Sequence, residues 1–507
     1  MALARTTSVA VVGVEGQLVE IQADLADGLP GVTMIGLPDA ALQEARDRIR
    51  AAIVNSGETW PVRRMTLALL PATLPKRGSM FDVALAVAVL AASGAVPVEP
   101  LADVVLLGEL GLDGRLRSTR GVLPAVVAAA RSGLRRVLVP AANLAEASLV
   151  PRLDVRGVDE LADLLGFLRG EPERTVTRPR ARRRREPPPP DLRDVVGQAV
   201  GRRAVEVAAA GGHHLLFAGP PGSGKTMLAE RLPGVLPPLG VDEALEVSAV
   251  HSVAGLLPAD TPLVRRPPYQ APHHTASTAA LVGGGSTLAR PGAVSLSHRG
   301  VLFLDEAPEF QSGVLDALRQ PLESGEVAIA RSGGVARFPA RFQLVLAANP
   351  CPCAAPAGEA DCRCSSLAKR RYFSRISGPL LDRVDLQVWL QPVTPAHLLD
   401  GLAVPEPSAA VAARVAAARG AAAGRLRGTG WRINAEVPGP QLRTRWRLPA
   451  SVTSGADLSL DRGELSARGY DRVLRLAWSI ADLGGRDRPS STDVDEAVHL
   501  RSRWVAA

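Results

Sequence analysis

The sequence predicts an α/β protein in three folded parts, two α/β domains followed by a helical domain. Three observations lead to this prediction. β-rich runs alternate with Ala-rich helical stretches in residues 1–170, apolar strand-like runs with flanking turn residues recur in residues 191–400, and strand patterns fade from about residue 401. The length of 507 residues and a hydrophobic content of 46% provide for several buried cores.

The first domain, residues 1–170, is expected to contain both strands and helices. The β-rich runs are 8–14, 19–23, 65–70, 104–107 and 136–139, and the helical stretches are 42–55, 81–92 and 124–132. Residues 171–190 follow as a linker, because an arginine cluster and four consecutive prolines cannot bury a core. This linker is either a solvated spacer or a direct phosphate-binding segment.

The second domain, residues 191–400, is expected to contain a parallel sheet. The runs 215–218, 301–304 and 343–347 are apolar throughout, as strands buried on both faces are. In the last domain, residues 401–507, the stretches 409–423 and 464–483 have helical periodicity, and Gly484 with Gly485 is expected to end the second of them.

Charge and composition indicate which classes of binding partner the protein has. Arginine and lysine number 59 against 51 acidic residues, which gives a net charge of +8 and favours polyanions such as nucleic acid. No run of 18 apolar residues occurs and the N-terminus does not resemble a signal peptide, so no membrane partner and a cytoplasmic location are expected.

The strongest motif is a phosphate-binding loop between a predicted strand and a predicted helix. It reads Gly219-Pro220-Pro221-Gly222-Ser223-Gly224-Lys225-Thr226. Glycines let backbone N–H groups surround the phosphates of ATP, Lys225 reaches the β- and γ-phosphates, and the Thr226 hydroxyl binds Mg²⁺. Only two other lysines, Lys76 and Lys369, occur in this arginine-rich chain.

Two carboxylates follow the predicted strand 301–304. Asp305 is expected to hold Mg²⁺, and Glu306 to orient or deprotonate the attacking water. Together with the phosphate-binding loop, these acids predict an ATPase and not only a nucleotide-binding protein.

Two further polar residues are candidates for the same site. Asn349 follows the strand-like run 343–347, where its amide would contact the γ-phosphate or the lytic water, unless it only caps a loop. Arg383 would supply positive charge to a neighbouring subunit's transition state, unless it is an ordinary surface ion-pair partner.

All four cysteines lie within a short segment, in two C-x-C pairs that suit one metal site in a reducing compartment. They are Cys351, Cys353, Cys362 and Cys364. Four thiolates so close in sequence predict a structural Zn²⁺ site, with four free thiols as the alternative. His273 and His274 have no second ligand pair near them and are interpreted as polar loop residues.

These motifs and several other segments closely resemble the ComM/YifB family of magnesium-chelatase-like AAA+ ATPases, nearly from end to end. The other segments are Gly36-Leu37-Pro38-Asp39, 108–114, 270–277, 281–285, 290–292, 322–327, 349–353 and 465–470. The resemblance implies a central AAA+ domain with a C-terminal helical lid, assembled as a hexamer in which Lys225, Thr226, Asp305 and Glu306 form one face of each ATP site.

The resemblance also assigns roles to single residues. Asn349 becomes sensor one, Arg383 the arginine finger of the adjacent subunit, and Arg468 the sensor-two arginine, with Arg472 and Arg475 as nearby alternatives. Members of the ComM type resemble DNA branch-migration helicases, which implies single-stranded or branched DNA as a partner in recombination or natural transformation.

Two loop-rich segments, 251–300 and 325–342, would face the pore of such a ring. Gly283, Gly284 and Gly285 could approach a phosphate chain, and Arg331, Arg337 and Arg341 could contact it. The alternatives are an ordinary solvated hairpin and, for the whole protein, a chelatase-like or chaperone-like ATPase that remodels a protein partner.

The first domain resembles the proteolytic domain of Lon-type proteases, through residues 108–114, 121–124 and 137–140. That resemblance implies a Ser–Lys dyad. Ser79 lies near the expected nucleophile position, but segment 120–130 contains no lysine and Lys76 belongs to another motif. A serine without an activating base is a poor nucleophile, so we expect a scaffold or DNA-binding domain without protease activity.

Overall fold

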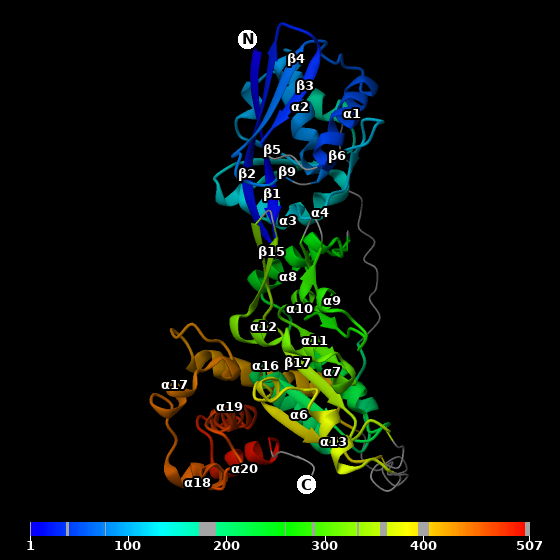
Figure 1. Ribbon diagram of the computed structural model, residues 1–507. Coiled ribbons are helices and arrows are strands. Elements are labelled where there is room, and N and C mark those ends of the chain that lie inside the picture. The colour runs from blue at the N-terminus through cyan, green and yellow to red at the C-terminus, as the bar shows by residue number, and fades with distance from the viewer. Residues whose placement is uncertain are drawn as a thin grey trace.

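A computed structural model describes residues 2–36, 40–76, 78–171, 189–258, 260–285, 289–331, 334–354, 362–393 and 405–501. The molecule is elongated, with an N-terminal sheet at one end and a second sheet with the C-terminal helices at the other (Figure 1). The predicted class, two α/β parts followed by a helical part, is confirmed. The linker, apart from its end residues, and Leu37 to Asp39 lie outside the described residues.

The N-terminal sheet has seven strands in the order β3-β4-β2-β1-β5-β8-β9. They are β1 (Ala2–Val12), β2 (Glu15–Ala26), β3 (Gly31–Ile35), β4 (Arg64–Leu70), β5 (Val104–Leu106), β8 (Arg136–Pro140) and β9 (Asp154–Val158). The long hairpin of β1 and β2 is antiparallel, whereas β5, β8 and β9 run parallel to one another. β3 and β9 were not expected from the sequence, because neither is a long apolar run. A separate small hairpin joins β6 (Glu109–Leu110) to β7 (Leu116–Arg117).

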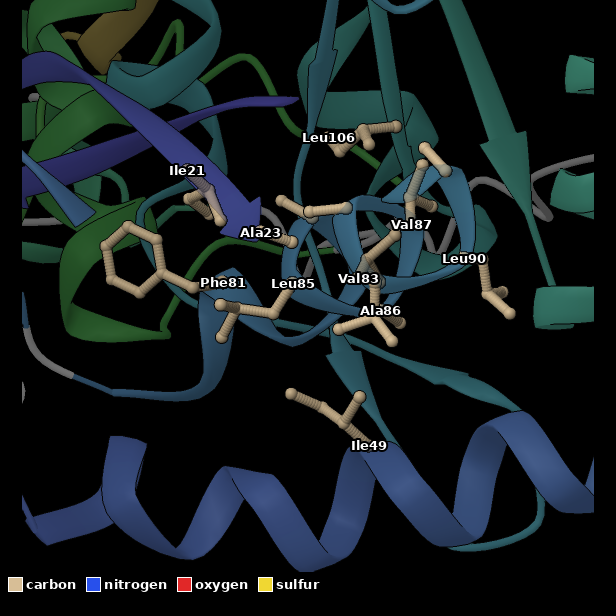
Figure 2. Packing of buried hydrophobic residues seen from close by; sticks show 14 of the residues in the cluster. Ile21, Ala23, Ile49, Phe81, Val83, Leu85, Ala86, Val87, Leu90 and Leu106 are labelled. Atoms are coloured by element: carbon tan, nitrogen blue, oxygen red, sulfur yellow. The ribbon is translucent and has the colours of Figure 1, made fainter. Parts of the chain in front are cut away.

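One helix forms the centre of the N-terminal core. The helices here are α1 (Ala40–Asn55), α2 (Asp82–Ala92), α3 (Val122–Arg131), α4 (Leu144–Ala147) and α5 (Leu161–Leu168). Every residue of α2 is buried, as expected for a helix that is apolar on all sides after its first residue, and Asp82 at its start pairs with Arg48 at 2.8 Å. Figure 2 shows its valines and leucines between Ile21 and Ala23 of the sheet and Ile49 of α1.

The second sheet is parallel throughout and has the order β11-β14-β17-β10-β18. Its strands are β10 (Leu215–Ala218), β11 (Tyr269–Gln270), β14 (Val301–Leu304), β17 (Gln343–Ala348) and β18 (Leu386–Trp389). The three predicted strands are its central members. Because parallel strands end at one edge of a sheet, the segments after β10, β14, β17 and β11 meet there.

Helices and two hairpins surround this sheet. The helices are α6 (Ala199–Gly211), α7 (Lys225–Val235), α8 (Val241–Ala254), α9 (Thr278–Val282), α10 (Ala293–Leu296), α11 (Ser312–Asp316), α12 (Arg319–Ser324), α13 (Ser366–Phe373) and α14 (Gly378–Leu381). The hairpins are β12 (Gly283–Gly284) with β13 (Arg290–Pro291), and β15 (Glu326–Arg331) with β16 (Gly334–Pro339). The segment 251–300, expected to be rich in loops, therefore contains several short elements.

The β15–β16 hairpin reaches the N-terminal sheet (Figure 1). Gly13 has a positive φ of 66°, and a Cβ there would lie 2.3 Å from the carbonyl oxygen of Arg337. Beside this contact, the N–H of Gly121, before α3, donates to the carbonyl of Ser252 on α8 at 3.1 Å. The two α/β parts are thus joined by backbone contacts that allow little room for side chains.

A carboxyl group is partly buried at the same interface. Ser252 donates from its hydroxyl to Glu146 at 3.3 Å. Burial raises the pKa of Glu146 to about 7, although hydrogen bonds from Ser252 and the backbone at Leu123 oppose the shift. The folded protein therefore favours the neutral form of Glu146 below about pH 7.

This raised pKa predicts a pH-dependent stability. The pKa of Glu146 in the folded protein lies above the value of 4.5 for an unperturbed carboxyl. The contribution of this group to the free energy of unfolding is therefore complete below about pH 4.5 and is lost as the pH rises through about 7. Glu146→Gln should raise the free energy of unfolding at pH 8 by up to about 3 kcal/mol. Thermal unfolding of both proteins from about pH 5 to pH 8 checks this, with exposed Glu99→Gln as control. Equal pH dependence in wild type and Glu146→Gln would contradict it.

The C-terminal part is helical, as expected. Its helices are α16 (Ser408–Arg425), α17 (Gly439–Arg443), α18 (Ala450–Asp461), α19 (Ala467–Leu483) and α20 (Ser491–His499). α19 stops just before Gly484, the predicted end, and begins after Ser466, whose Oγ accepts from the N–H of Gly469 at 3.1 Å. Among the described residues, no helix has the length and apolar character needed to cross a membrane.

Candidate functional site

The phosphate-binding loop runs from β10 into α7, as its motif predicts. Gly222 and Gly224 have φ values of +74° and +85°, which favour glycine. Lys225 donates from Nζ to the carbonyl oxygens of Gly219 and Pro220, both at 2.8 Å. Burial lowers the pKa of Lys225, and the charges of Asp305 and Glu306 oppose that shift. The ammonium is therefore held inside the loop and faces both carboxylates.

The residues expected to bind Mg²⁺ lie together at the end of β14. Thr226 donates from its hydroxyl to Oδ2 of Asp305 at 2.8 Å. A hydroxyl and a carboxylate oxygen are the ligand types that Mg²⁺ takes in proteins, usually beside phosphate oxygens and water. These two residues fit a Mg²⁺ ion bound next to the phosphate-binding loop.

Glu306 has an unusual backbone that turns the chain away from the sheet. Its φ and ψ are 49° and 45°, in the left-handed region that non-glycine residues rarely occupy, and its N–H donates to Oδ1 of Asp305 at 2.9 Å. Strained backbone of this kind is concentrated at functional sites. Glu306 leads directly into the short 3₁₀ helix Ala307–Glu309.

His274 is a partner of Glu306 that the sequence interpretation missed. Its Nδ1 lies 3.2 Å from Oε2 of Glu306, and its ring packs on that of His273 with centroids 4.1 Å apart. His274 belongs to the loop after β11, and β11 pairs in parallel with β14, so both loops leave the same edge of the sheet. The pairing of these two strands, invisible in either segment alone, is the signal that could have found it.

The contact predicts that His274 restrains Glu306. His274→Ala should raise ATP turnover measured without any partner by about three- to tenfold, because a half-exposed contact between a ring nitrogen and a carboxylate contributes about 1 kcal/mol. Steady-state phosphate release checks this, and His273→Gln serves as the neighbouring control. A fall in turnover would instead mean that His274 orients Glu306 for reaction.

Asn349 follows β17, which lies between β14 and β10 in the sheet. Its position is thus between the loop that carries Lys225 and the strand that carries Asp305, and its side chain is half-buried. The structure therefore brings Asn349 to the same edge of the sheet as Lys225, Thr226, Asp305 and Glu306.

Arg383 lies in a separate group of arginines. Its side chain is 13% exposed, pairs with Glu323 and donates to the carbonyl of Pro379 at 2.5 Å. Burial lowers the pKa of Arg383, and the nearby charges of Arg319, Arg468 and Arg472 lower it further. Arg383 and Arg468 thus lie near each other within one subunit.

The contacts of α19 distinguish Arg468 from Arg472 and Arg475. Arg472 pairs with the buried Asp385, and Arg475 donates to the carbonyl of Val437 at 2.7 Å. Arg468 is exposed. Of the three arginines, Arg468 is therefore the one whose guanidinium is not engaged in fixing α19 to its surroundings, as far as the described contacts go.

A buried polar network joins α19 to the core sheet. Asp385 accepts from the N–H of His214 at 2.9 Å, and Nε2 of His213 lies 2.7 Å from Oγ of Ser479 on α19. Burial lowers the pKa of both histidines to about 4, so they are neutral at physiological pH. Nearby Arg472 keeps the pKa of Asp385 low despite its burial. The segment that carries Arg383 is therefore connected to α19 by buried polar contacts.

The four cysteines form one cluster. Their Sγ atoms all lie within 4.8 Å of one another, with Cys351 and Cys353 3.1 Å apart, and Cys362 3.4 Å from Cys351. Four sulfurs around Zn²⁺ at about 2.3 Å would be separated by about 3.8 Å, so the cluster fits a tetrahedral site. Burial and the neighbouring thiols raise the pKa of Cys351 to about 12.

The candidate DNA-contacting residues are only partly brought together. Arg331 donates from Nε to the carbonyl of Gly285 at 2.9 Å, next to the Gly283–Gly284 strand. Arg337 pairs with Glu326 on the same hairpin. Arg331 thus lies beside Gly283, Gly284 and Gly285. The charge of Arg337, in contrast, is balanced by Glu326.

Among the described residues of the N-terminal domain, Ser79 and Lys76 have separate partners. The hydroxyl of Ser79 donates to the carboxylate of Glu109, and Nζ of the fully buried Lys76 donates to the carbonyl of Pro71. A carboxylate is bound to the hydroxyl of Ser79, where a protease of this type would need a lysine. In the described contacts the partner of the Ser79 hydroxyl is therefore Glu109 and not a lysine.

Comparison with known proteins agrees with this architecture. The family described as magnesium chelatase, subunit ChlI, matches residues 191–398, its related subunit ChlI family matches residues 21–143, and the C-terminal family of that subunit matches residues 405–501. The three matches cover both α/β parts and the helical part.

Full-length relatives are also similar. An uncharacterized protein of Mycobacterium tuberculosis is 58% identical over 99% of both chains. YifB of Escherichia coli and the competence protein ComM of Haemophilus influenzae are each 40% identical over 99% of this chain and 97% and 98% of their own lengths. A Lon protease of Mycolicibacterium smegmatis is 29% identical over 31% of this chain and 22% of its own length, in line with the Lon-like N-terminal part.

Proposed function

Because this chain belongs to the family of magnesium-chelatase-like AAA+ proteins that includes YifB and ComM, we propose that it is a ring-forming, Mg²⁺-dependent ATPase motor that moves along or remodels DNA. Its activity is branch migration of single-stranded or branched DNA, in recombination or natural transformation. The observation that carries the ATPase part is the hydrogen bond between Thr226 and Asp305 beside the buried ammonium of Lys225.

Each side chain at this edge has a chemical task. The loop N–H groups and Lys225 bind the phosphates of ATP, while Thr226 and Asp305 hold Mg²⁺. When bound, Mg²⁺ neutralises charge that develops on the phosphates. Glu306 accepts a proton from the attacking water, and the amide of Asn349 orients that water or the γ-phosphate.

The arginine group completes the site across a subunit boundary. Arg383 and Arg468 lie near each other, so one subunit would present both to the nucleotide of its neighbour in a hexamer. A cation placed there stabilises the charge of the transition state. Glu323 holds Arg383 until the neighbour's phosphates compete for its guanidinium.

Several features support DNA as the substrate. The chain carries a net charge of +8, and Arg331 meets the glycine hairpin of Gly283 and Gly284 without an acidic partner among the described residues. Phosphate contacts by arginine, without base readout, are typical of motors that track a strand. The alternative is a chelatase-like or chaperone-like ATPase that acts on a protein partner.

The direct test uses a synthetic four-way DNA junction with one labelled strand. The wild-type protein with Mg²⁺ and ATP should convert the junction into duplex products, and Glu306→Gln should bind the junction without converting it. The double variant Arg331→Glu/Arg337→Glu should lose both binding and conversion. If the wild-type protein hydrolysed ATP but did not convert the junction, the result would favour the protein-remodelling alternative.

The cysteine cluster is proposed to hold structural Zn²⁺. Removing two ligands in Cys353→Ser/Cys364→Ser should abolish bound zinc and lower the melting temperature by about 5–10 °C, which corresponds to roughly 2–3 kcal/mol in a domain of this size. Metal analysis of the purified protein and thermal unfolding measure the two effects. Wild-type protein that contains no zinc when purified without chelators would overturn this assignment.

A further inference from the structure

A cavity of about 390 Å³ lies between the N-terminal domain and the AAA+ domain. Its walls come from the end of β1, the loop before α3, the end of α8 and both hairpins of the AAA+ domain. Pockets that bind small molecules begin at roughly 300 Å³, so the space is large enough for one nucleotide. The ATP site uses none of these residues.

Positive charge dominates this cavity. Arg120 reaches it from the N-terminal domain, and Arg290 and Arg331 reach it from the AAA+ domain. None of the three has an acidic partner among the described residues, and Arg331 donates only to carbonyl oxygens of the chain. Glu109 is the one acidic residue in the described lining, and its carboxylate accepts from Ser79. The lining therefore has an excess of two positive charges.

The rest of the lining is suited to the non-phosphate parts of a nucleotide. Valines of β1, Val253 and Ile329 supply apolar surface for a sugar and a base. The exposed Ser118 also lines the cavity.

We infer that this interdomain cavity binds a nucleoside phosphate, with Arg120, Arg290 and Arg331 around the phosphate. The phosphate belongs either to one unit of a DNA strand or to a free nucleotide. The strand form rests on the proposed function, since it extends the path of DNA from the glycine hairpin to the N-terminal domain. The free-nucleotide form does not depend on it.

Binding there would reach the ATP site through the backbone. Arg331 ends β15, β16 completes the hairpin, and β17 follows and leads to Asn349. A ligand that pulls on Arg331 thus acts on the hairpin that precedes Asn349. The N-terminal domain would then have a role in ligand binding that does not depend on protease activity.

The test measures binding to the full-length protein with saturating ADP and Mg²⁺, so that the phosphate-binding loop is occupied. The strand probe is fluorescein-labelled oligothymidylate, followed by anisotropy, and the free-nucleotide probe is thymidine monophosphate, followed by calorimetry. Arg120→Glu/Arg290→Glu changes one arginine on each side of the cavity. Arg135→Glu, exposed in the N-terminal domain and outside the lining, is the charge-matched control.

For the strand form, the double variant should weaken oligothymidylate binding by about ten- to a hundredfold. The plot of log K against log salt should become less steep, its slope decreasing in magnitude by about 1.4, since each lost single-strand phosphate contact contributes about 0.7. For the free-nucleotide form, thymidine monophosphate should bind wild type and not the double variant. Melting temperatures of all proteins exclude misfolding as the cause, and Arg120→Gln should give a smaller loss in the same direction.

Two results would overturn the inference, and they are distinguishable from failure of the proposed function. Oligothymidylate that binds the double variant with wild-type affinity and salt slope, while thymidine monophosphate binds neither protein, would leave a DNA motor without this site. Wild type that binds neither probe would exclude the cavity as a nucleotide site. DNA-dependent ATP turnover, measured separately, then decides whether the proposed function survives.

Discussion

Glu306→Gln is expected to lower ATP turnover by about 10²–10⁴-fold, the usual contribution of a positioned general base. The substitution keeps the size of the side chain but removes the carboxylate that accepts the proton of water. ATP binding should persist, because Lys225, Thr226 and the loop are unchanged. Phosphate release and binding of a fluorescent ATP analogue measure the two properties.

The chain offers a matched control in Glu309, three residues further on. It is exposed and pairs with Arg375 at 3.0 Å. Glu309→Gln should therefore retain turnover near that of wild type. Turnover by Glu306→Gln at the wild-type rate would show that another group activates the water.

The second large effect concerns Arg383→Ala, for which a loss of about 10³-fold or more is expected. An arginine that acts on the neighbouring subunit's ATP can be distinguished by mixing. Arg383→Ala subunits retain an intact Lys225 face, and Lys225→Ala subunits retain an intact Arg383. Mixed rings should recover turnover that neither inactive variant has alone.

The nearby Arg319 is the control for this experiment. Its guanidinium lies 4.0 Å from Asp316, and its charge is one of those that lower the pKa of Arg383. Arg319→Ala should leave most of the turnover in place. Loss of activity in Arg383→Ala without recovery on mixing would place the arginine's action within its own subunit.

The parts of the site that the sequence predicts best are those that a local motif determines. The glycines from Gly219 to Gly224 dictate a loop between a strand and a helix, and an apolar strand delivers Asp305 and Glu306 to the sheet edge. Contacts between distant segments were not predictable in this way. His274 lies beside Glu306 because β11 neighbours β14, and that strand order is a property of the whole sheet.

In the fold, too, locally determined elements were predictable and those that depend on distant segments were not. α2, which is apolar after its first residue, was expected as a helix, whereas β3 and β9 depend on pairing with β4 and β8 at the two edges of the sheet. The group around Arg383 and the cavity near Arg120 arise where segments that are distant in the sequence meet. Burial of the Arg383 side chain follows from tertiary packing, which charge patterns along the chain do not reveal.

One measurement tests the central claim most directly: ATP hydrolysis by the purified protein with and without single-stranded, duplex and four-way-junction DNA, beside Glu306→Gln. A DNA motor predicts clear stimulation by single-stranded or branched DNA, which Glu306→Gln lacks. Turnover that is the same with all three DNAs and without DNA would contradict DNA as the substrate. The ATPase would then stand, and the partner would be a protein.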